Sequence, residues 1–268
     1  MLIDHDVGAV NEQYEYHAAL LRLACYCGRG DIVQESLYHG IKANSENFQG
    51  ENPLHLLSQG EYESQEDGIC IVRELLEWGV DVNAQSKCHK TPLHFASYFG
   101  RQAIAQVLLD HNANPDAEDG YGETPLHLVS RGKYSSQEDG VGVARLLLKY
   151  GADVNARDGE KRTPLHHASY NGMVAIAQVL LEHGGTPNAS DSNGESPLHL
   201  ALQGRDEEHG IDMTLLLLEH DVDVDVQDNN HVTPLDLSSR LLPKIANILL
   251  EYSANVFWYL RSANVDEL

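Results

Sequence analysis

The sequence predicts an all-α repeat solenoid, a stack of helix-turn-helix units joined by β-turn or hairpin loops. One tetrapeptide pattern recurs along the chain, each copy opens an apolar run of helical length, and a turn-rich segment leads from each unit to the next. The copies are Asn52-Pro53-Leu54-His55, Thr91-Pro92-Leu93-His94, Thr124-Pro125-Leu126-His127, Thr163-Pro164-Leu165-His166, Ser196-Pro197-Leu198-His199 and Thr233-Pro234-Leu235-Asp236. A fixed period of about 33 residues is typical of repeat architectures.

Each copy is expected to begin a helix, because proline suits the first helical turn and the preceding polar side chain can cap free backbone N–H groups. In the unit that starts at Thr163, the first helix should end at Gly172. A second apolar run, from Val174 to Leu181, then ends at Gly184. Two short antiparallel helices per unit follow from this pattern. The segment before the unit, 152–159, is rich in turn residues and predicts a β-turn or hairpin.

The register shows that the repeats come in pairs. Because residues 21–28 align with residues 93–100, a degenerate first unit is expected to start near Ala19. The expected starts are residues 19, 52, 91, 124, 163, 196 and 233. Spacings of 33 residues alternate with longer ones, so the true period is a pair 72 residues long, as Tyr26, Tyr98 and Tyr170 illustrate. The extra residues form inserts between first and second helices, at 59–68, 131–140 and, in a shorter version, 204–210.

The two ends depart from the repeat pattern. Residues 1–15 are expected to be the tail of a preceding repeat or an N-terminal cap, residues 16–264 a single repeat domain, and residues 253–268 a C-terminal cap or tail. The last helix is expected over 242–252. After it, Phe257-Trp258-Tyr259-Leu260 replaces the polar hairpin, either as a cap on the final unit or as an exposed end that meets a following domain. The half repeat at the start suggests a segment of a longer protein.

The Thr-Pro-Leu-His openings and the Gly-Ala-Asp-Val-Asn segment at 151–155 resemble the ankyrin-repeat family over nearly the whole chain. The resemblance implies that units stack because none buries its apolar face alone. It also implies that the motif histidine bonds neighbouring backbone. The function implied is a non-catalytic protein–protein interaction scaffold, with the partner held in a concave groove and at the hairpin tips. The alternative is a targeting or autoinhibitory region of a larger multidomain enzyme of the NTPase, kinase or ubiquitin-ligase type.

Ten residues of this groove and these tips are candidates for partner binding. They are Phe48, Tyr98, Phe99, Tyr121, Glu123, Arg162, His167, Tyr170, Asn171 and Asn193. Aromatic residues and arginine often anchor interfaces. The alternative for the aromatic candidates, and for Phe95, is packing between adjacent units.

The inserts suggest a second, opposite binding surface. Its candidate residues are Tyr62, Glu66, Asp67, Tyr134, Glu138 and Asp139. Two matching sites at one pitch could give avidity, and the alternative is plain inheritance from duplication of the 72-residue pair. The resemblance also implies that Asn83 and Asn155, each within Asp-Val-Asn-Ala, are candidates for asparagine hydroxylation.

Composition narrows the class of partner. The chain has 18 Lys and Arg against 41 Asp and Glu, a formal charge of −23, which argues against binding nucleic acid through its phosphates. A protein partner that is neutral or basic is expected, although solvation alone accounts for part of the acidity. No apolar run is long enough to span a membrane and no signal peptide is recognisable. We therefore expect an intracellular protein, cytoplasmic or nuclear, that is a monomeric array or a segment of a larger chain.

The sequence predicts no catalytic, metal or cofactor site. Five of the 15 histidines belong to the repeat motif. The four cysteines, Cys25, Cys27, Cys70 and Cys88, have neither zinc-ligand nor disulfide-framework spacing. No glycine-rich phosphate loop, nucleophile elbow or unique pair of carboxylates is present. The cysteines are expected to be reduced.

Overall fold

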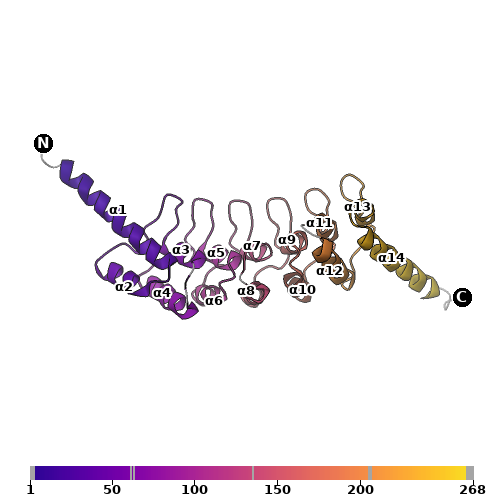
Figure 1. The fold of residues 1–268 in the computed structure, drawn as a ribbon, viewed down its shortest axis with the longest axis horizontal. Coiled ribbons are helices and arrows are strands. Elements are labelled where there is room, and N and C mark those ends of the chain that lie inside the picture. The colour runs from indigo at the N-terminus through magenta and orange to yellow at the C-terminus, as the bar shows by residue number, and fades with distance from the viewer. Residues whose placement is uncertain (1–3, 61, 63, 135, 205–206, 264–268) are drawn as a thin grey trace. The chain divides into compact units, whose positions relative to one another are not determined.

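The computed structural model describes residues 4–60, 62, 64–134, 136–204 and 207–263, which fall into two units, Met1–Ala152 and Asp153–Leu268 (Figure 1). The helices of the first unit are α1 (Asp4–Tyr26), α2 (Gly30–Tyr38), α3 (Pro53–Gln59), α4 (Gln65–Glu77), α5 (Pro92–Tyr98), α6 (Gln102–Asp110), α7 (Pro125–Val129) and α8 (Gln137–Lys149). Those of the second unit are α9 (Pro164–Asn171), α10 (Val174–Glu182), α11 (Pro197–Gln203), α12 (Glu207–Leu218), α13 (Pro234–Leu241) and α14 (Pro243–Ala263). The described residues contain no β-strand, which confirms the all-α prediction.

Within each unit the helices form two rows, with the loops projecting from one edge (Figure 1). In the first unit, first helices α1, α3, α5 and α7 contact one another in succession, and so do second helices α2, α4, α6 and α8. In the second unit the rows are α9, α11 and α13, and α10, α12 and α14. Each repeat therefore stacks on its neighbours, as expected for a solenoid. That the two units make one domain over residues 16–264 stays a prediction.

The core of each unit lies between the two rows of helices. The leucine of the tetrapeptide is fully buried in the first five copies, as Leu93 in α5 and Leu165 in α9 illustrate, and partly buried in the last, as Leu235. Leucines of the second helices, such as Leu108 in α6 and Leu180 in α10, face them and are also fully buried. Because a two-helix repeat is too thin to enclose these side chains, their burial depends on the adjacent repeats.

The tetrapeptide begins each first helix through its side chains. Helices α3, α5, α7, α9, α11 and α13 all start at the motif proline. In α5 the backbone N–H of the N-cap residue Thr91 donates to Nδ1 of His94 at 3.0 Å, and in α9 that of Thr163 donates to Nδ1 of His166 at 3.1 Å. The hydroxyl of Thr91 or Thr163 lies 2.9 Å from the same nitrogen. Histidine thus takes the place that Glu or Gln fills in a capping box.

The same histidine connects one repeat to the next. Nε2 of His94 lies 3.0 Å from the backbone carbonyl of Glu123, and Nε2 of His166 lies 3.1 Å from that of Glu195. Since Nδ1 accepts a backbone N–H, the ring proton must sit on Nε2 and be donated to the carbonyl. His55 and His199 make the equivalent bonds, to Lys90 and Val232. These hydrogen bonds show the structural role that was expected for the motif histidines.

Tyr134 of the second insert closes onto the end of the preceding first helix. A side chain at Gly100, the second residue after the end of α5, would put its Cβ 2.8 Å from Tyr134 Cδ1. Gly132 lies between the Tyr134 ring and the backbone carbonyl of Tyr98, so a Cβ there would overlap both. Lys133 N–H donates to that carbonyl at 2.8 Å. Burial raises the pKa of Tyr134 well above its usual range.

Tyr62 packs in the same way 72 positions earlier, against Gly28 and Gly68. The Arg101 guanidinium lies over its ring, 5.2 Å from the centroid. Burial raises the pKa of Tyr62 to about 12, although the positive charge of Arg101 acts in the opposite direction. The insert tyrosines therefore pack between repeats.

The terminal helices are longer than the repeat pattern predicts. Helix α1 begins at Asp4 and passes through Ala19, where the first unit was expected to start, because no proline precedes Leu21 to fix a helix start. Helix α14 runs from Pro243 to Ala263 and does not stop at residue 252, because no glycine or proline follows Pro243. The side chains of residues 257–260 lie outside the described residues, so the reading of that run as a cap or an exposed end stays untested.

We expect the histidine bridges to make stability depend on pH below neutrality. Burial lowers the pKa of His94 and of His166 from 6.5 to about 4, despite the carbonyl that each donates to. Between these values the unfolded chain binds a proton at each histidine that the folded chain excludes. The free energy of unfolding should therefore fall as pH falls, by about 1.4 kcal/mol per pH unit per histidine.

The measurement is urea unfolding of the full chain and of His94→Gln between pH 7.5 and 4.5. The variant should be less stable at pH 7.5, by about 1–3 kcal/mol, because a buried carbonyl loses its donor. Its loss of stability on acidification should be smaller than that of the parent chain. The comparison cancels the carboxylate titrations common to both proteins, so an equal pH dependence in the two would contradict the assignment.

We also expect Gly132→Ala to destabilise the first unit by about 1–3 kcal/mol, through overpacking. Its Cβ would overlap the Tyr98 carbonyl and lie 2.6 Å from Tyr134 Cε1. Gly30→Ala is the matched control, because its Cβ would meet its nearest atom, Ile71 Cγ1, at 3.6 Å. Thermal unfolding of both variants measures the difference, and equal stability of the two would show that the insert is loosely packed.

Candidate protein-interaction surface

The loops between repeats end in tips of one geometry. These tips are residues 47–51, 86–90, 119–123, 158–162, 191–195 and 228–232. In each, the N–H of the first residue donates to the carbonyl of the fifth at 2.9–3.0 Å, and the N–H of the fourth donates to the carbonyl of the first at 2.9–3.1 Å. The fourth residue is left-handed, with φ between 58° and 77°. This is a hairpin turn of three residues with a bulge, so the expected hairpin forms without strands.

A side chain at the first position holds each tip rigid. Asp119 Oδ1 accepts the backbone N–H groups of Tyr121 and Glu123 at 2.8 and 3.0 Å, and Asp158 Oδ1 accepts those of Glu160 and Arg162 at 2.9 and 2.8 Å. Such bonds from an aspartate to backbone two residues on are typical of Asx-turns. The backbone of every tip is thus largely fixed before any partner arrives.

Neighbouring tips are also bonded to one another within each unit. In the first unit, Lys87 N–H donates to the carbonyl of Gln49 and Gly120 N–H donates to that of Cys88, both at 2.9 Å. In the second unit, Ser192 N–H donates to the carbonyl of Glu160 and Asn229 N–H to that of Asn193, again at 2.9 Å. The tips of a unit therefore form one continuous edge.

Three of the candidate residues at the tips are presented to solvent. Phe48 is 82% exposed and Tyr121 73% exposed, both in the first unit, and Asn193 is exposed in the second. Two other candidates serve the protein itself. Glu123 is buried and forms an ion pair with Arg131. Arg162 pairs with two carboxylates, because its Nη1 lies 2.7 Å from Oε2 of Glu160 and its Nε lies 3.2 Å from Oδ2 of Asp191. Charges that are paired in this way are less available to a partner.

The candidates on the first helices are less exposed. The rings of Tyr98 and Phe99 are partly buried and meet edge to face, with centroids 5.1 Å apart. Asn171 is partly buried, and its amide donates to the carbonyl of His167 at 2.8 Å. Tyr170 is 43% exposed. Of these candidates, Tyr170 offers the most surface.

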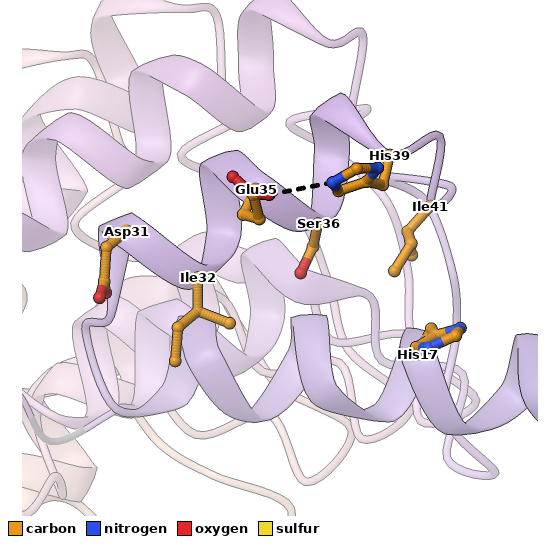
Figure 2. Close-up of a pocket in the computed structure, with 7 residues that line it drawn as sticks. All are labelled: His17, Asp31, Ile32, Glu35, Ser36, His39 and Ile41. Carbon is orange, nitrogen blue, oxygen red and sulfur yellow. Dashed lines mark hydrogen bonds and ion pairs between the residues drawn. The ribbon is translucent and has the colours of Figure 1, made fainter.

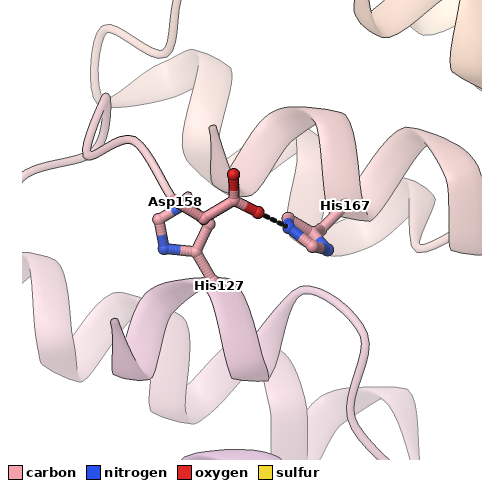
Figure 3. Close-up of side chains that lie close together, drawn as sticks. All are labelled: His127, Asp158 and His167. Carbon is pink, nitrogen blue, oxygen red and sulfur yellow. Dashed lines mark hydrogen bonds and ion pairs between the residues drawn. The ribbon is translucent and has the colours of Figure 1, made fainter. Parts of the chain in front are cut away.

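His167 is held by an acidic residue of the tip. Its Nε2 lies 2.8 Å from Asp158 Oδ2, and the two side chains face each other in Figure 3. Burial alone would raise the pKa of Asp158, but the bonds from His167 and from backbone N–H groups outweigh it and lower that pKa. The pair ties the first helix α9 to its own tip.

The acidic residues of the inserts lie at helix N-termini. Glu66 and Asp67 occupy the first turn of α4, and Glu138 and Asp139 that of α8. Negative charge is favourable there because the exposed backbone N–H groups carry partial positive charge. A second docking surface at the inserts stays a prediction, and it would have to use these carboxylates, since both tyrosine rings are packed inward.

The two candidates for hydroxylation bridge successive loops. The side-chain amide of Asn83 donates to the carbonyl of Asn112 at 3.0 Å, and its oxygen accepts Asn114 N–H at 2.8 Å. Asn155 bonds Gly184 and Thr186 in the same manner, at 3.0 and 2.9 Å. Both side chains therefore have a structural role, and their modification stays a prediction.

Sequence reasoning missed an open cleft between α1 and α2. It has a volume of about 620 Å³ and is lined by His17, Asp31, Ile32, Glu35, Ser36, His39 and Ile41. Nε2 of His39 lies 2.9 Å from Oε1 of Glu35, and Figure 2 shows the two side chains next to each other. Ile32 is 39% exposed, whereas Ile104, its counterpart 72 positions later, is 1% exposed. Because both positions carry isoleucine, residue type gave no signal of this open face, which appears only in the three-dimensional arrangement.

The four cysteines are all free thiols. Cys25 is buried, and Cys27, Cys70 and Cys88 are exposed and unbonded. Among the described residues, no helix has both the length and the apolar character required to cross a membrane.

Comparison with known proteins agrees with this architecture. A family model of ankyrin repeats in three copies matches residues 61–158 and 134–209, and a model of the single ankyrin repeat matches residues 193–229. Similar proteins include palmitoyltransferase AKR1 of Lachancea kluyveri, 32% identical over 120 residues that make up 42% of this chain and 14% of that protein. They also include palmitoyltransferase ZDHHC17 of Danio rerio, 45% identical over 62 residues, which are 23% of this chain and 10% of that protein.

A third relative is ankyrin repeat and SOCS box protein 16 of Mus musculus, 34% identical over 108 residues, which are 40% of this chain and 24% of that protein. The chain thus spans only a small part of the length of each of these relatives. The family models match more than half of the chain, and the histidine bridges and stacked helix pairs match the architecture that the motif implies. The chain belongs to the ankyrin-repeat family, whose repeats form protein-interaction domains.

Proposed function

We propose that this chain is a non-catalytic scaffold that binds a protein partner through its hairpin tips and the adjoining surface of its first helices. The observation that carries the proposal is the exposure of two large aromatic side chains, Phe48 and Tyr121, on tips whose backbone is held by hydrogen bonds. Aromatic side chains often dominate the binding energy of an interface.

The rigidity of the tips supports this choice of surface. Association costs free energy for every loop that must be ordered, so a preordered loop binds more tightly than a mobile one with the same side chains. Asp119 holds the tip that carries Tyr121, and Asn47 holds the tip that carries Phe48 by accepting N–H groups of Gln49 and Glu51 at 2.8 and 2.9 Å. A partner would meet these rings already in place.

The net charge of −23 supports a neutral or basic partner. Opposite charge on the partner would speed its association with this chain. Salt would reduce this acceleration, because exposed charges are screened over about 10 Å at 0.1 M ionic strength. The exposed, unbonded Cys27, Cys70 and Cys88 support an intracellular location, cytoplasmic or nuclear, where thiols stay reduced.

The bonding of the motif histidines supports a non-catalytic role. Both ring nitrogens of His94 and of His166 are occupied by backbone groups, so neither ring is available for proton transfer to a substrate. Among the charged groups of the tips, Arg162, Asp158 and Glu123 bond to neighbours within the chain. The charges of these groups therefore stabilise the fold of the chain.

A second candidate function is supported by the comparisons. Two of the similar proteins are named palmitoyltransferases and another is named a ubiquitin-protein ligase, and this chain covers at most 14% of each. The array would then be the targeting or autoinhibitory region of a larger enzyme. Both functions require the same binding surface, and the sequence on either side of this chain in its source would distinguish them.

We expect Phe48→Ala combined with Tyr121→Ala to weaken partner binding by tenfold or more, because loss of one interface anchor typically costs about 1–2 kcal/mol or more. Proteins captured from extract of the source cells by the parent chain and by the variant are compared quantitatively. The affinity of the captured partner is then measured with purified proteins. Folding should be unchanged, because both side chains are exposed.

Tyr38→Ala combined with Trp78→Ala is the matched control. These residues are 80% and 52% exposed. Tyr38 is the last residue of second helix α2 and Trp78 directly follows second helix α4, away from the tips. Partner affinity that is kept in the control and lost in the tip variant supports the proposed surface. Equal affinity of the tip variant and the parent chain would show that the tips are not where the partner binds.

A further inference from the structure

Two grooves of the same construction lie beside the hairpin loops, one in each unit. The groove of the first unit is lined by Asn83, Gln85, Thr91, Asn114, Asp116, Ala117 and Glu118, and has a volume of about 520 Å³. Every one of these positions has its counterpart 72 residues later in the lining of the second groove, whose volume is about 510 Å³. The paired repeat thus provides two matched surfaces on one backbone.

The two grooves differ in charge. In the first, Asp116 and Glu118 contribute two carboxylates, and their counterparts in the second are Asn188 and Ser190. The second groove instead gains two cations, Arg157 in place of Gln85 and Lys161 in place of His89. We call it the basic groove. Its two cations stand out in a chain of net charge −23.

The cations of the basic groove are exposed. Among the described residues neither Arg157 nor Lys161 makes an ion pair, whereas the acidic residue in the lining, Asp191, is already bonded. Asp191 is held by Arg162 and by the backbone N–H groups of Asn193 and Glu195 at 2.8 and 3.0 Å. The negative charge of Asp191 is thus balanced by Arg162, and the charges of Arg157 and Lys161 remain as the net positive charge of the groove.

Lys161 has a backbone conformation that is unfavourable for a residue other than glycine. Its φ is 60°, in the left-handed region at the fourth position of a tip, where Gly50, Gly122 and Gly194 stand in other tips. A non-glycine residue in this conformation costs roughly 1 kcal/mol. The side chain lines the groove without a bond to its own chain, so internal hydrogen bonding does not explain its presence.

We propose that the basic groove binds carboxylate side chains of an acidic segment in the protein partner, with Arg157 and Lys161 as the anchoring charges. The hydroxyl groups of Thr186 and Ser190 are exposed in the same lining and can donate to the bound carboxylate. This inference rests on the proposed scaffold function and names one feature of the partner that the function leaves open.

An acidic peptide fits the groove better than nucleic acid does. Binding along a phosphate backbone requires several cations in a row, and this groove has two within a strongly acidic chain. A short acidic stretch in an otherwise neutral or basic partner meets both constraints. Its carboxylates enter the basic groove while the rest of the partner faces the acidic surface.

The test is an NMR titration of the isotope-labelled full chain with an acetylated, amidated decapeptide containing three glutamates, and with its glutamine counterpart. We expect the glutamate peptide, and not the glutamine peptide, to shift the signals of residues 155–163 and 186–191. In Arg157→Gln combined with Lys161→His, which gives the groove the residues of its acidic counterpart, binding should weaken roughly three- to tenfold, the range expected for exposed ion pairs. His89 already has a φ of 58° at the equivalent position, so the backbone tolerates this change.

Lys42→Gln combined with Lys133→Gln removes the same charge from two exposed positions outside the groove and should bind the peptide like the parent chain. Equal shifts with the two peptides, or equal binding by the groove variant and this control, would overturn the proposal. The peptide is defined, so the result does not depend on finding the natural partner. If this titration fails while the tip variant still loses the partner, the scaffold function stands and only the acidic anchor is lost.

Discussion

The bridge made by the motif histidine is the interaction on which the rest of this structure depends. One ring fixes the start of its own helix through Nδ1 and the position of the next loop through Nε2, so local structure and repeat stacking are specified by a single side chain. The bridge requires the neutral ring with its proton on Nε2. Burial enforces this state at His94 and His166, where the pKa is lowered to about 4. The loops then stand in a fixed register, and the tips that they carry become a regular edge within each unit.

Much of this architecture could be predicted from the sequence, because the hydrogen bonds that start each helix join residues that are close together in the sequence. Thr91 and His94 are three residues apart, so the pattern that predicts the helix also contains its capping partners. The helix starts at Pro53, Pro92, Pro125, Pro164, Pro197 and Pro234 all follow from it. The boundaries of the two terminal helices were predicted less accurately. Residues 4–26 and 243–263 lack the proline and glycine punctuation that marks boundaries inside the array, and helix length there is set by the absence of a stop signal.

The candidate surface was harder to predict, because residue type does not reveal whether a side chain packs inside the protein or faces solvent. Tyr62 and Tyr121 are both tyrosines in loops, yet the first packs against Gly28 and Gly68 and the second is 73% exposed. Glycine at positions 28 and 68 could have indicated the packing of Tyr62, but only once the fold brought these residues together. Glu123 and Arg162 are likewise charged tip residues whose partners, Arg131 and Asp191, lie 8 and 29 positions away. Pairing at that range requires the three-dimensional arrangement.

Some loop residues form hydrogen bonds to the next loop, and others are exposed to solvent. Because these are different positions, one array can carry different side chains at equivalent exposed positions of its repeats. Asn83 and Asn155 make the same two backbone bonds 72 positions apart, so they must stay the same for the loops to keep their register. Two residues further on, Gln85 and Arg157 are exposed. Gln85 Oε1 lies 3.2 Å from Nδ1 of His89 within its own loop and does not bridge to a neighbouring loop, so the identity of this residue can change at little cost in stability. Exposed substitutions away from such structural features usually change stability by less than about 0.5 kcal/mol. The charge and polarity of the two grooves can therefore differ while the bonds that maintain the backbone remain constant.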